Sequence, residues 1–165
     1  MRNGIWVGLA IAACVACVKH VPQDSKTGED GRTKGARELK IENNEGRARG
    51  IVTYPGGDRS DWKVITLPKD QVGSVELKLR WTPPRPGLDL SFEVYNEYYR
   101  VLDAAKPNVR QRSRKTTKSV TVDNVTGKLY VQVYASGRGD AGAYMLTAAW
   151  KAATTVDPLD HLDQR

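Results

Sequence analysis

The stretch Gly73–Tyr95, GSVELKLRWTPPRPGLDLSFEVY, contains two runs in which apolar and polar residues alternate. The apolar positions of the two runs are Val75, Leu77, Leu79, Trp81, Leu88, Leu90, Phe92 and Val94. Side chains two positions apart lie on the same face of a β-strand, so each run predicts a strand with one apolar and one hydrated face. The segment PPRPG between the runs predicts a turn. Two such strands form a core only if other elements cover their apolar faces.

Shorter runs of the same kind lie on both sides of this stretch, with turn-forming residues between them. The further strands are expected at 51–54, 61–67, 98–102, 117–122, 128–134 and 143–150. In the run 61–67, Trp62, Val64 and Thr66 share one face. No long run of helical period follows the first 17 residues. The pattern therefore predicts an all-β, antiparallel sandwich of about seven to eight strands over residues 50–151.

The N-terminus has the features of an export signal. A short basic segment, MRN, precedes the apolar run Gly4–Ala13, which is shorter than the ~20 residues that a membrane-spanning helix needs. The residues Ile11–Cys14, IAAC, resemble a bacterial lipobox, in which the cysteine is acylated, palmitate included, and becomes the mature N-terminus. Residues 1–17 are thus expected to be a lipoprotein signal peptide with a signal helix, cleaved before Cys14 or before Cys17. Neither cysteine precedes an aspartate, which by resemblance to the known sorting rule favours the outer membrane; a periplasmic or secreted protein is the alternative.

Two segments lack the apolar content of a folded element. Residues 18–49 carry many charges of both signs and few apolar side chains, which predicts a flexible, disordered tether. Residues 152–165 are polar and are expected to be a disordered tail. Both cysteines lie in the leader, so the folded part is expected to have neither a disulfide nor a thiolate metal site.

Several motifs occur in an order that resembles the bacterial pre-peptidase C-terminal domain. They are DRSDWKV at 58–64, GSV at 73–75, LDLSFEVY at 88–95, GKLYVQVY at 127–134 and GAYML at 142–146. The resemblance covers about residues 49–150 and implies a jelly-roll-like β-sandwich. Members of that family usually flank secreted peptidases as accessory, binding or processing modules, whereas this chain carries no peptidase. The basic segment before residue 117 has no counterpart in the family pattern.

Aspartates expected near the loop ends are weak candidates for a metal site. These are Asp58, Asp61 and Asp89, with Asp140 beside them. Some sandwiches of the resembled kind bind calcium through aspartates, and calcium takes six to eight oxygen ligands. The chain has no contiguous D-x-D-x-D-G loop, so the preferred interpretation is that Asp58 and Asp61 cap a turn and that no metal is bound.

A basic segment and an outward pair of tyrosines are the candidate binding residues. The segment 106–118 has no acidic residue, and its main candidates are Arg110, Arg112, Arg114 and Lys115. It could bind an anionic polysaccharide or lipid, or be the hydrated face of an edge strand. Since 128–134 places leucine and valine inward, Tyr130 and Tyr134 are expected to face outward, either as contacts for a partner or packed against a neighbouring loop. The formal charge of +7 fits an anionic partner and ordinary solubility equally.

The sequence favours a non-catalytic function without a cofactor. The expected domain contains no cysteine and no histidine, so it cannot build a cysteine- or serine-histidine nucleophile. The basic segment lacks interleaved aromatics, and export removes most nucleic acids as partners. The predicted function is an envelope-anchored binding module for a polysaccharide or protein of the envelope. The alternative is a structural subunit of an envelope secretion or motility complex, and a weaker one is a hydrolase or inhibitor accessory.

Overall fold

A computed structural model describes residues 29–54, 58–84, 87–106, 115–135 and 137–153 of the chain. One short 3-10 helix, η1 (Thr33–Gly35), precedes a series of strands. The strands are β1 (Arg37–Glu38), β2 (Glu45–Thr53), β3 (Ser60–Thr66), β4 (Gly73–Thr82), β5 (Ser91–Asn96), β6 (Val101–Ala105), β7 (Thr117–Val125), β8 (Lys128–Tyr134) and β9 (Ala141–Ala152).

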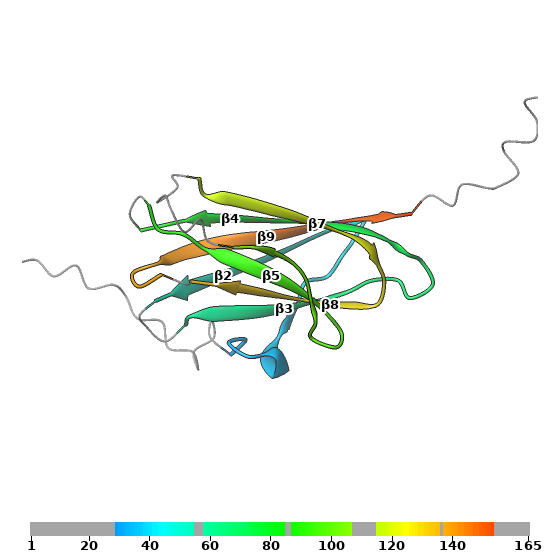
Figure 1. The fold of residues 1–165 in the computed structure, drawn as a ribbon, viewed down its shortest axis with the longest axis horizontal. Coiled ribbons are helices and arrows are strands. Elements are labelled where there is room, and N and C mark those ends of the chain that lie inside the picture. The colour runs from blue at the N-terminus through cyan, green and yellow to red at the C-terminus, as the bar shows by residue number, and fades with distance from the viewer. Residues whose placement is uncertain (1–28, 55–57, 85–86, 107–114, 136, 154–165) are drawn as a thin grey trace, which may run out of the picture.

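The strands form two sheets that face each other (Figure 1). The five-stranded sheet has the order β1-β3-β8-β5-β6, and the four-stranded sheet has the order β2-β9-β4-β7. Every pairing is antiparallel except β1 with β3, which is parallel. The prediction of an all-β sandwich is confirmed, with this one parallel pair as an addition.

The two strands of the central stretch belong to different sheets. β4 lies inside the four-stranded sheet between β9 and β7, whereas β5 lies in the five-stranded sheet between β8 and β6. The apolar side of β4 and the apolar residues at and before β5 are buried in the same core, which includes Leu77, Leu79, Leu90, Phe92 and Val94. The segment between the strands therefore carries the chain from one sheet to the other, and the two strands contribute apolar side chains to the same core.

The prediction of a flexible linker over 18–49 is wrong for residues 29–49. Asp30 and Leu39 are buried, β1 pairs with β3, and β2 pairs with β9 from Glu45 onward. The inward positions at the start of β2 are Gly46, Ala48 and Gly50, which give no hydrophobic signal. A Cβ at Gly46 would collide with the backbone carbonyl oxygen of Lys40 and with the side chain of Leu39, so the small residue there is required by packing. Residues 18–28 and the tail from 154 lie outside the described residues.

The alternation in β3 is as expected, but its apolar-looking face is the outer one. Trp62 and Val64 are half-buried on the outside of the sheet, while Asp61, Lys63 and Ile65 point into the interior. Two charged side chains consequently lie inside the sandwich. The outward placement of Trp62 and the inward placement of Asp61 and Lys63 define the two polar sites described below.

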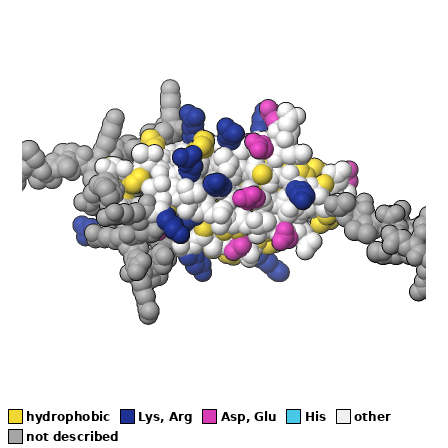
Figure 2. Space-filling view, turned by 90° about the horizontal axis from the view of Figure 1, so that it is seen from above, with side chains coloured by type: hydrophobic (Ala, Val, Ile, Leu, Met, Phe, Trp, Pro, Cys, Tyr) yellow, Lys and Arg dark blue, Asp and Glu magenta, His cyan; other side chains and the backbone are white. Residues whose placement is uncertain are grey.

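One face of the described surface is mixed in charge. Seen from the side of β4 and β7, lysine and arginine side chains are interspersed with aspartate and glutamate, and hydrophobic side chains show in small groups (Figure 2). Across the described ranges, no helix combines the length and apolar character required to cross a bilayer.

Candidate functional site

The outer face of the five-stranded sheet carries a group of aromatic side chains, which we call the aromatic face. It consists of Trp62, Tyr95, Tyr99, Tyr130 and Tyr134. The register places Tyr130 opposite both Val64 of β3 and Tyr95 of β5, so three strands contribute neighbouring side chains. The rings of Trp62 and Tyr95 have centroids 5.1 Å apart at 40°. The expectation that Tyr130 and Tyr134 face outward is confirmed by the half-buried, alternating pattern of β8.

The turn between β5 and β6 brings Tyr99 onto this face. The side-chain oxygen of Asn96 accepts hydrogen bonds from the backbone N–H groups of Tyr98 and Arg100, both at 3.0 Å. Tyr99 has a φ of 57°, in the left-handed region, which reverses the chain. Its ring lies 5.0 Å from that of Tyr130. The pKa of the Tyr130 hydroxyl is raised, first by a hydrogen bond with Tyr99 and then by burial.

Glu93 links the tyrosine hydroxyls of the face. Its two carboxylate oxygens accept hydrogen bonds from the Tyr95 hydroxyl at 2.6 Å and from the Tyr134 hydroxyl at 3.1 Å. The Tyr95 oxygen also lies 3.3 Å from the side-chain oxygen of Gln132. Burial, followed by the Glu93 carboxylate, raises the pKa of Tyr134 to about 12 and that of Tyr95 further. Both hydroxyls therefore stay protonated, and the bonds to Glu93 hold the two rings in fixed orientations.

A shallow groove of about 440 Å³ runs beside these rings. Its lining consists of Arg59, Ser60, Glu93, Gln132 and Tyr134. The guanidinium of Arg59 is held 4.3 Å above the ring of Tyr54, a cation–π contact that limits the motion of the arginine. The groove thus combines flat aromatic surface with charged, amide and hydroxyl groups. Fixed rings beside a few hydrogen-bonding groups suit an amphipathic ligand such as a sugar chain.

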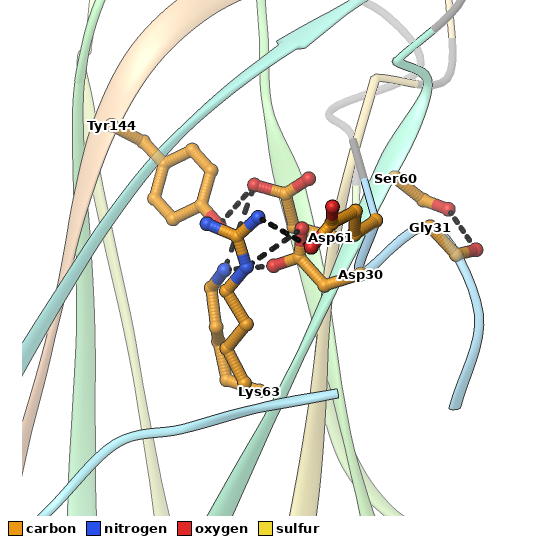
Figure 3. A network of polar contacts seen from close by, with 8 residues as sticks. Asp30, Gly31, Ser60, Asp61, Lys63 and Tyr144 are labelled. Carbon is orange, nitrogen blue, oxygen red and sulfur yellow. Dashed lines mark hydrogen bonds and ion pairs between the residues drawn. The ribbon is translucent and has the colours of Figure 1, made fainter. Parts of the chain in front are cut away.

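A second polar cluster, which we call the buried cluster, lies inside the sandwich (Figure 3). The Lys63 ammonium donates to Asp30 and lies 3.8 Å from Asp61, and the Tyr144 hydroxyl donates to Asp61 at 2.5 Å. Arg37 lies 3.7 Å from the other oxygen of Asp30. Asp30 and Asp61 are fully buried, and Lys63 is 2% exposed. Buried charges persist in proteins when they are paired in this way.

Asp58 adds a third carboxyl group to the buried cluster. Burial, and then the negative charges of Asp61 and Asp30, raise the pKa of Asp58 to about 8. Burial also raises the pKa of Asp61 to about 6. At neutral pH, Asp58 is therefore mostly protonated, and the anions Asp30 and Asp61 face the cations Lys63 and Arg37. The cluster holds two charges of each sign and fastens the segment before β1 to β3.

The acidic candidates from the sequence do not form one site. Asp58 and Asp61 lie in the buried cluster, so their interpretation as turn caps is wrong; the cause is that Asp61 of β3 points inward and that Asp58, two residues before β3, is buried beside it. Asp89 pairs with Lys118 at 2.8 Å, and Asp140 accepts from the backbone N–H groups of Asp89 and Gly137. Within the described ranges, no group of three or more acidic, histidine or cysteine residues could hold a metal ion. The calcium site implied by the family resemblance does not fit these residues, because the Lys63 ammonium already lies among the carboxylates.

The remaining candidates are placed only in part. Cys14, Cys17, Arg110, Arg112 and Arg114 lie outside the described residues, and Lys115 is exposed. Sequence reasoning found Tyr130 and Tyr134 but missed Trp62, Glu93 and Gln132 as their neighbours. The signal for Trp62 was ambiguous, because a tryptophan next to valine in an alternating run looks like a core residue. The pairing of β3 with β8 places Trp62 on the same outer face as Tyr130 and Tyr134.

Comparisons with known proteins add information on the fold. No protein-family model matches the chain, and no curated protein matches it. Among solved structures, the chain is similar to the pre-peptidase C-terminal domain of collagenase from Bacillus anthracis, with a TM-score of 0.52 and 16% sequence identity. The match covers 68% of this chain and 93% of the other. The chain therefore has a fold like that of pre-peptidase C-terminal domains.

Proposed function

We propose that this chain is a non-catalytic binding module whose aromatic face recognises an envelope polysaccharide. The observation that carries the proposal is the pair of tyrosine hydroxyls held by Glu93 next to Trp62 and the groove. Trp62 and the tyrosines offer ring faces for stacking against sugar rings. Arg59, Ser60 and Gln132 offer donors and acceptors for sugar hydroxyls along the groove.

A protein partner is the other occupant that the same face would suit, because tyrosine and tryptophan are enriched at protein interfaces. A polysaccharide is favoured by the groove, which is lined mainly by polar groups rather than by a central apolar pocket. Protein interfaces are usually centred on such an apolar anchor. Participation in an envelope secretion or motility complex is therefore the second candidate function.

We further propose that the module is lipid-anchored at the bacterial outer membrane through Cys14 or Cys17. The support is the lipobox-like sequence directly after the apolar run of the leader. A diacylated or triacylated cysteine would anchor the chain stably, since each buried methylene contributes about 0.8 kcal/mol. The sandwich would then act close to the membrane, among envelope polysaccharides.

Affinity electrophoresis of residues 18–165 through gels containing a bacterial envelope polysaccharide tests the binding role. All pairings and contacts described above lie within 29–153, so this chain contains the whole sandwich. We expect retardation of the wild type and its loss in Trp62→Ala and Glu93→Gln. Glu76→Gln, an exposed glutamate of β4 in the other sheet, is the matched control and should migrate like the wild type.

Equal retardation of Glu93→Gln and Glu76→Gln would place the binding elsewhere on the molecule. If no envelope polysaccharide retards the wild type, while the intact chain co-purifies with an envelope protein through Trp62, the structural-subunit function is supported instead.

A further inference from the structure

Four basic side chains form a compact array on the outer face of the four-stranded sheet, opposite the aromatic face. In the register of β2-β9-β4, Arg49 and Arg80 both lie opposite Met145. Arg47 and Lys78 both lie opposite Thr147 in the next outward row. All four basic residues are exposed and alternate with less exposed, inward positions. Strand geometry places their Cα atoms at the corners of a rectangle of about 10 by 7 Å. We call these four residues the cationic array.

Among the residues that the structure describes, little neutralises the array. Arg47 lies 3.6 Å from Glu45, but both side chains are about two-thirds exposed, and such pairs contribute little. Within the described part of the chain, no carboxylate lies within ion-pair distance of Arg49, Lys78 or Arg80. The nearest acidic row, Glu45 and Glu76 on either side of Ala149, borders the array at one end only.

We propose that the cationic array docks the sandwich on an anionic phospholipid surface. Lysine and arginine next to such a surface are each attracted to its phosphate groups. The array also has apolar neighbours that fit the headgroup region: Ile51, 37% exposed, lies in the row beyond Arg49, and Met145 lies between the two columns of cations. Basic side chains around short apolar ones are typical of surfaces that lie at the membrane interface.

An acidic polysaccharide is the competing polyanion, and the composition of the face argues against it. Among the outward residues of β2, β9, β4 and β7, none is aromatic, so this face offers no ring for stacking on a sugar. Stacking rings are instead concentrated on the opposite sheet. The two outer faces thus differ in chemistry, with phosphate-binding cations on one and sugar-stacking rings on the other.

The length of the chain before the sandwich is compatible with docking. Glu29 lies 12 positions after Cys17 (29 − 17) or 15 positions after Cys14 (29 − 14). Fully extended, these segments reach roughly 40 to 50 Å, enough for the lipid and the array to engage one membrane together. The tether then raises the local concentration of the array at the surface, so a weak contact suffices. The aromatic face would point away from the membrane.

Vesicle flotation of unlipidated residues 18–165 tests the proposal. The probes are vesicles of phosphatidylcholine alone and of phosphatidylcholine mixed with phosphatidylglycerol, each at low and at physiological salt. We expect binding only to the anionic vesicles, weakened by salt. Each cation is expected to contribute about fivefold to the partition coefficient. The variant Arg47→Gln, Arg49→Gln, Lys78→Gln, Arg80→Gln should therefore lose about two orders of magnitude or more.

A matched variant removes the same net charge from other exposed sites: Lys34→Gln, Lys69→Gln, Lys128→Gln, Arg138→Gln. It should lose far less binding than the array variant. Equal losses in the two variants, or no binding of the wild type to anionic vesicles, would overturn the proposal. Array-dependent binding to polygalacturonate without vesicle binding would also overturn it and assign the array to a polysaccharide. Retardation in the polysaccharide gel should be unchanged in the array variant, so a failure here leaves the function of the aromatic face separately testable.

Discussion

At the residue scale, the protonation of Asp58 connects the buried cluster to the pH dependence of folding. The pKa of Asp58 rises from an ordinary value of 3.8 to about 8 in the folded chain. Between these values the folded state holds a proton that the unfolded state releases, so stability from this group is full below pH 4 and is lost as the pH rises to about 8. Asp61, whose pKa is raised to about 6, acts in the same direction over a narrower range.

We expect Asp58→Asn to remove the larger part of this pH dependence, because asparagine is neutral at every pH. At pH 8 the variant should exceed the wild type in free energy of unfolding by about 2 kcal/mol or more, and the difference should shrink toward pH 4. Urea denaturation across this range measures it. Asp123→Asn, an exposed position, is the control and should follow the wild type. Parallel profiles for Asp58→Asn and the wild type would contradict the assignment.

Lys63 provides the strongest single test of the buried cluster. Lys63→Met keeps most of the side-chain volume but leaves Asp30 and Asp61 without their buried counter-charge. Removal of one partner from a buried ion pair typically costs about 3–5 kcal/mol. Lys69→Met, at an exposed loop position, should stay within about 0.5 kcal/mol of the wild type in the same denaturation measurement. Similar midpoints for the two variants would show that Lys63 is not the compensating charge.

At the element scale, the segment of residues 29–44 is part of the domain because it contributes β1, the buried Leu39 and the Asp30 partner of Lys63. A chain beginning at Glu29 should keep the thermal midpoint of residues 18–165. A chain beginning at Glu45 should lose about 5 kcal/mol of stability, or fail to fold, since it uncovers Lys63 and apolar surface. Calorimetry of the two truncations decides between them. Equal midpoints would restore the interpretation of this segment as a linker.

The elements differ in how far the sequence could predict them, for physical reasons. β4, β8 and β9 bury large apolar side chains at every second position, so their faces and approximate ends are evident from the sequence. β2 has glycine and alanine at its inward positions near the start, and the close approach of Asp61 and Tyr144 leaves no room for a Cβ at Gly50. A strand that is selected for close backbone approach carries no hydrophobic signal. In β3 the alternation is present but suggests the wrong buried face, because Asp61 and Lys63 point inward and Trp62 points outward.

The candidate site, like the strands, was predictable only where the alternation of apolar and polar residues reveals which side chains face outward. The outward orientation of Tyr130 and Tyr134 follows from the leucine and valine that alternate with them in β8. The neighbours on the aromatic face come from β3 and β5, which are distant in sequence and adjacent only through the sheet order. The cationic array has the same origin, because Arg49 and Arg80 share a row only through β9. Pairing between distant strands is the information that alternation alone does not contain.

At the scale of the whole molecule, the two sheets of the sandwich carry different chemistry on their outer faces and share one core. A rigid sandwich with a membrane-binding face would orient its opposite face toward the periplasm or the exterior. The proposed polysaccharide and lipid contacts therefore do not compete for the same surface. Both contacts should be possible at once, and the proposed lipid anchor would place the molecule at a membrane where both ligands are present.

The proposed anchor at Cys14 or Cys17 can be tested in the native protein. Membrane fractionation of the native protein beside Cys14→Ala and Cys17→Ala, with mass spectrometry of the mature N-terminus, should find a diacyl or triacyl adduct on one cysteine. Replacement of that cysteine should release the protein from the membrane at high salt, because the cationic array alone is screened under those conditions. At low salt, part of the unlipidated protein should stay bound through the array. A wild-type protein that is soluble and unlipidated would refute the anchor and would leave the vesicle and polysaccharide tests as the assays of the two faces.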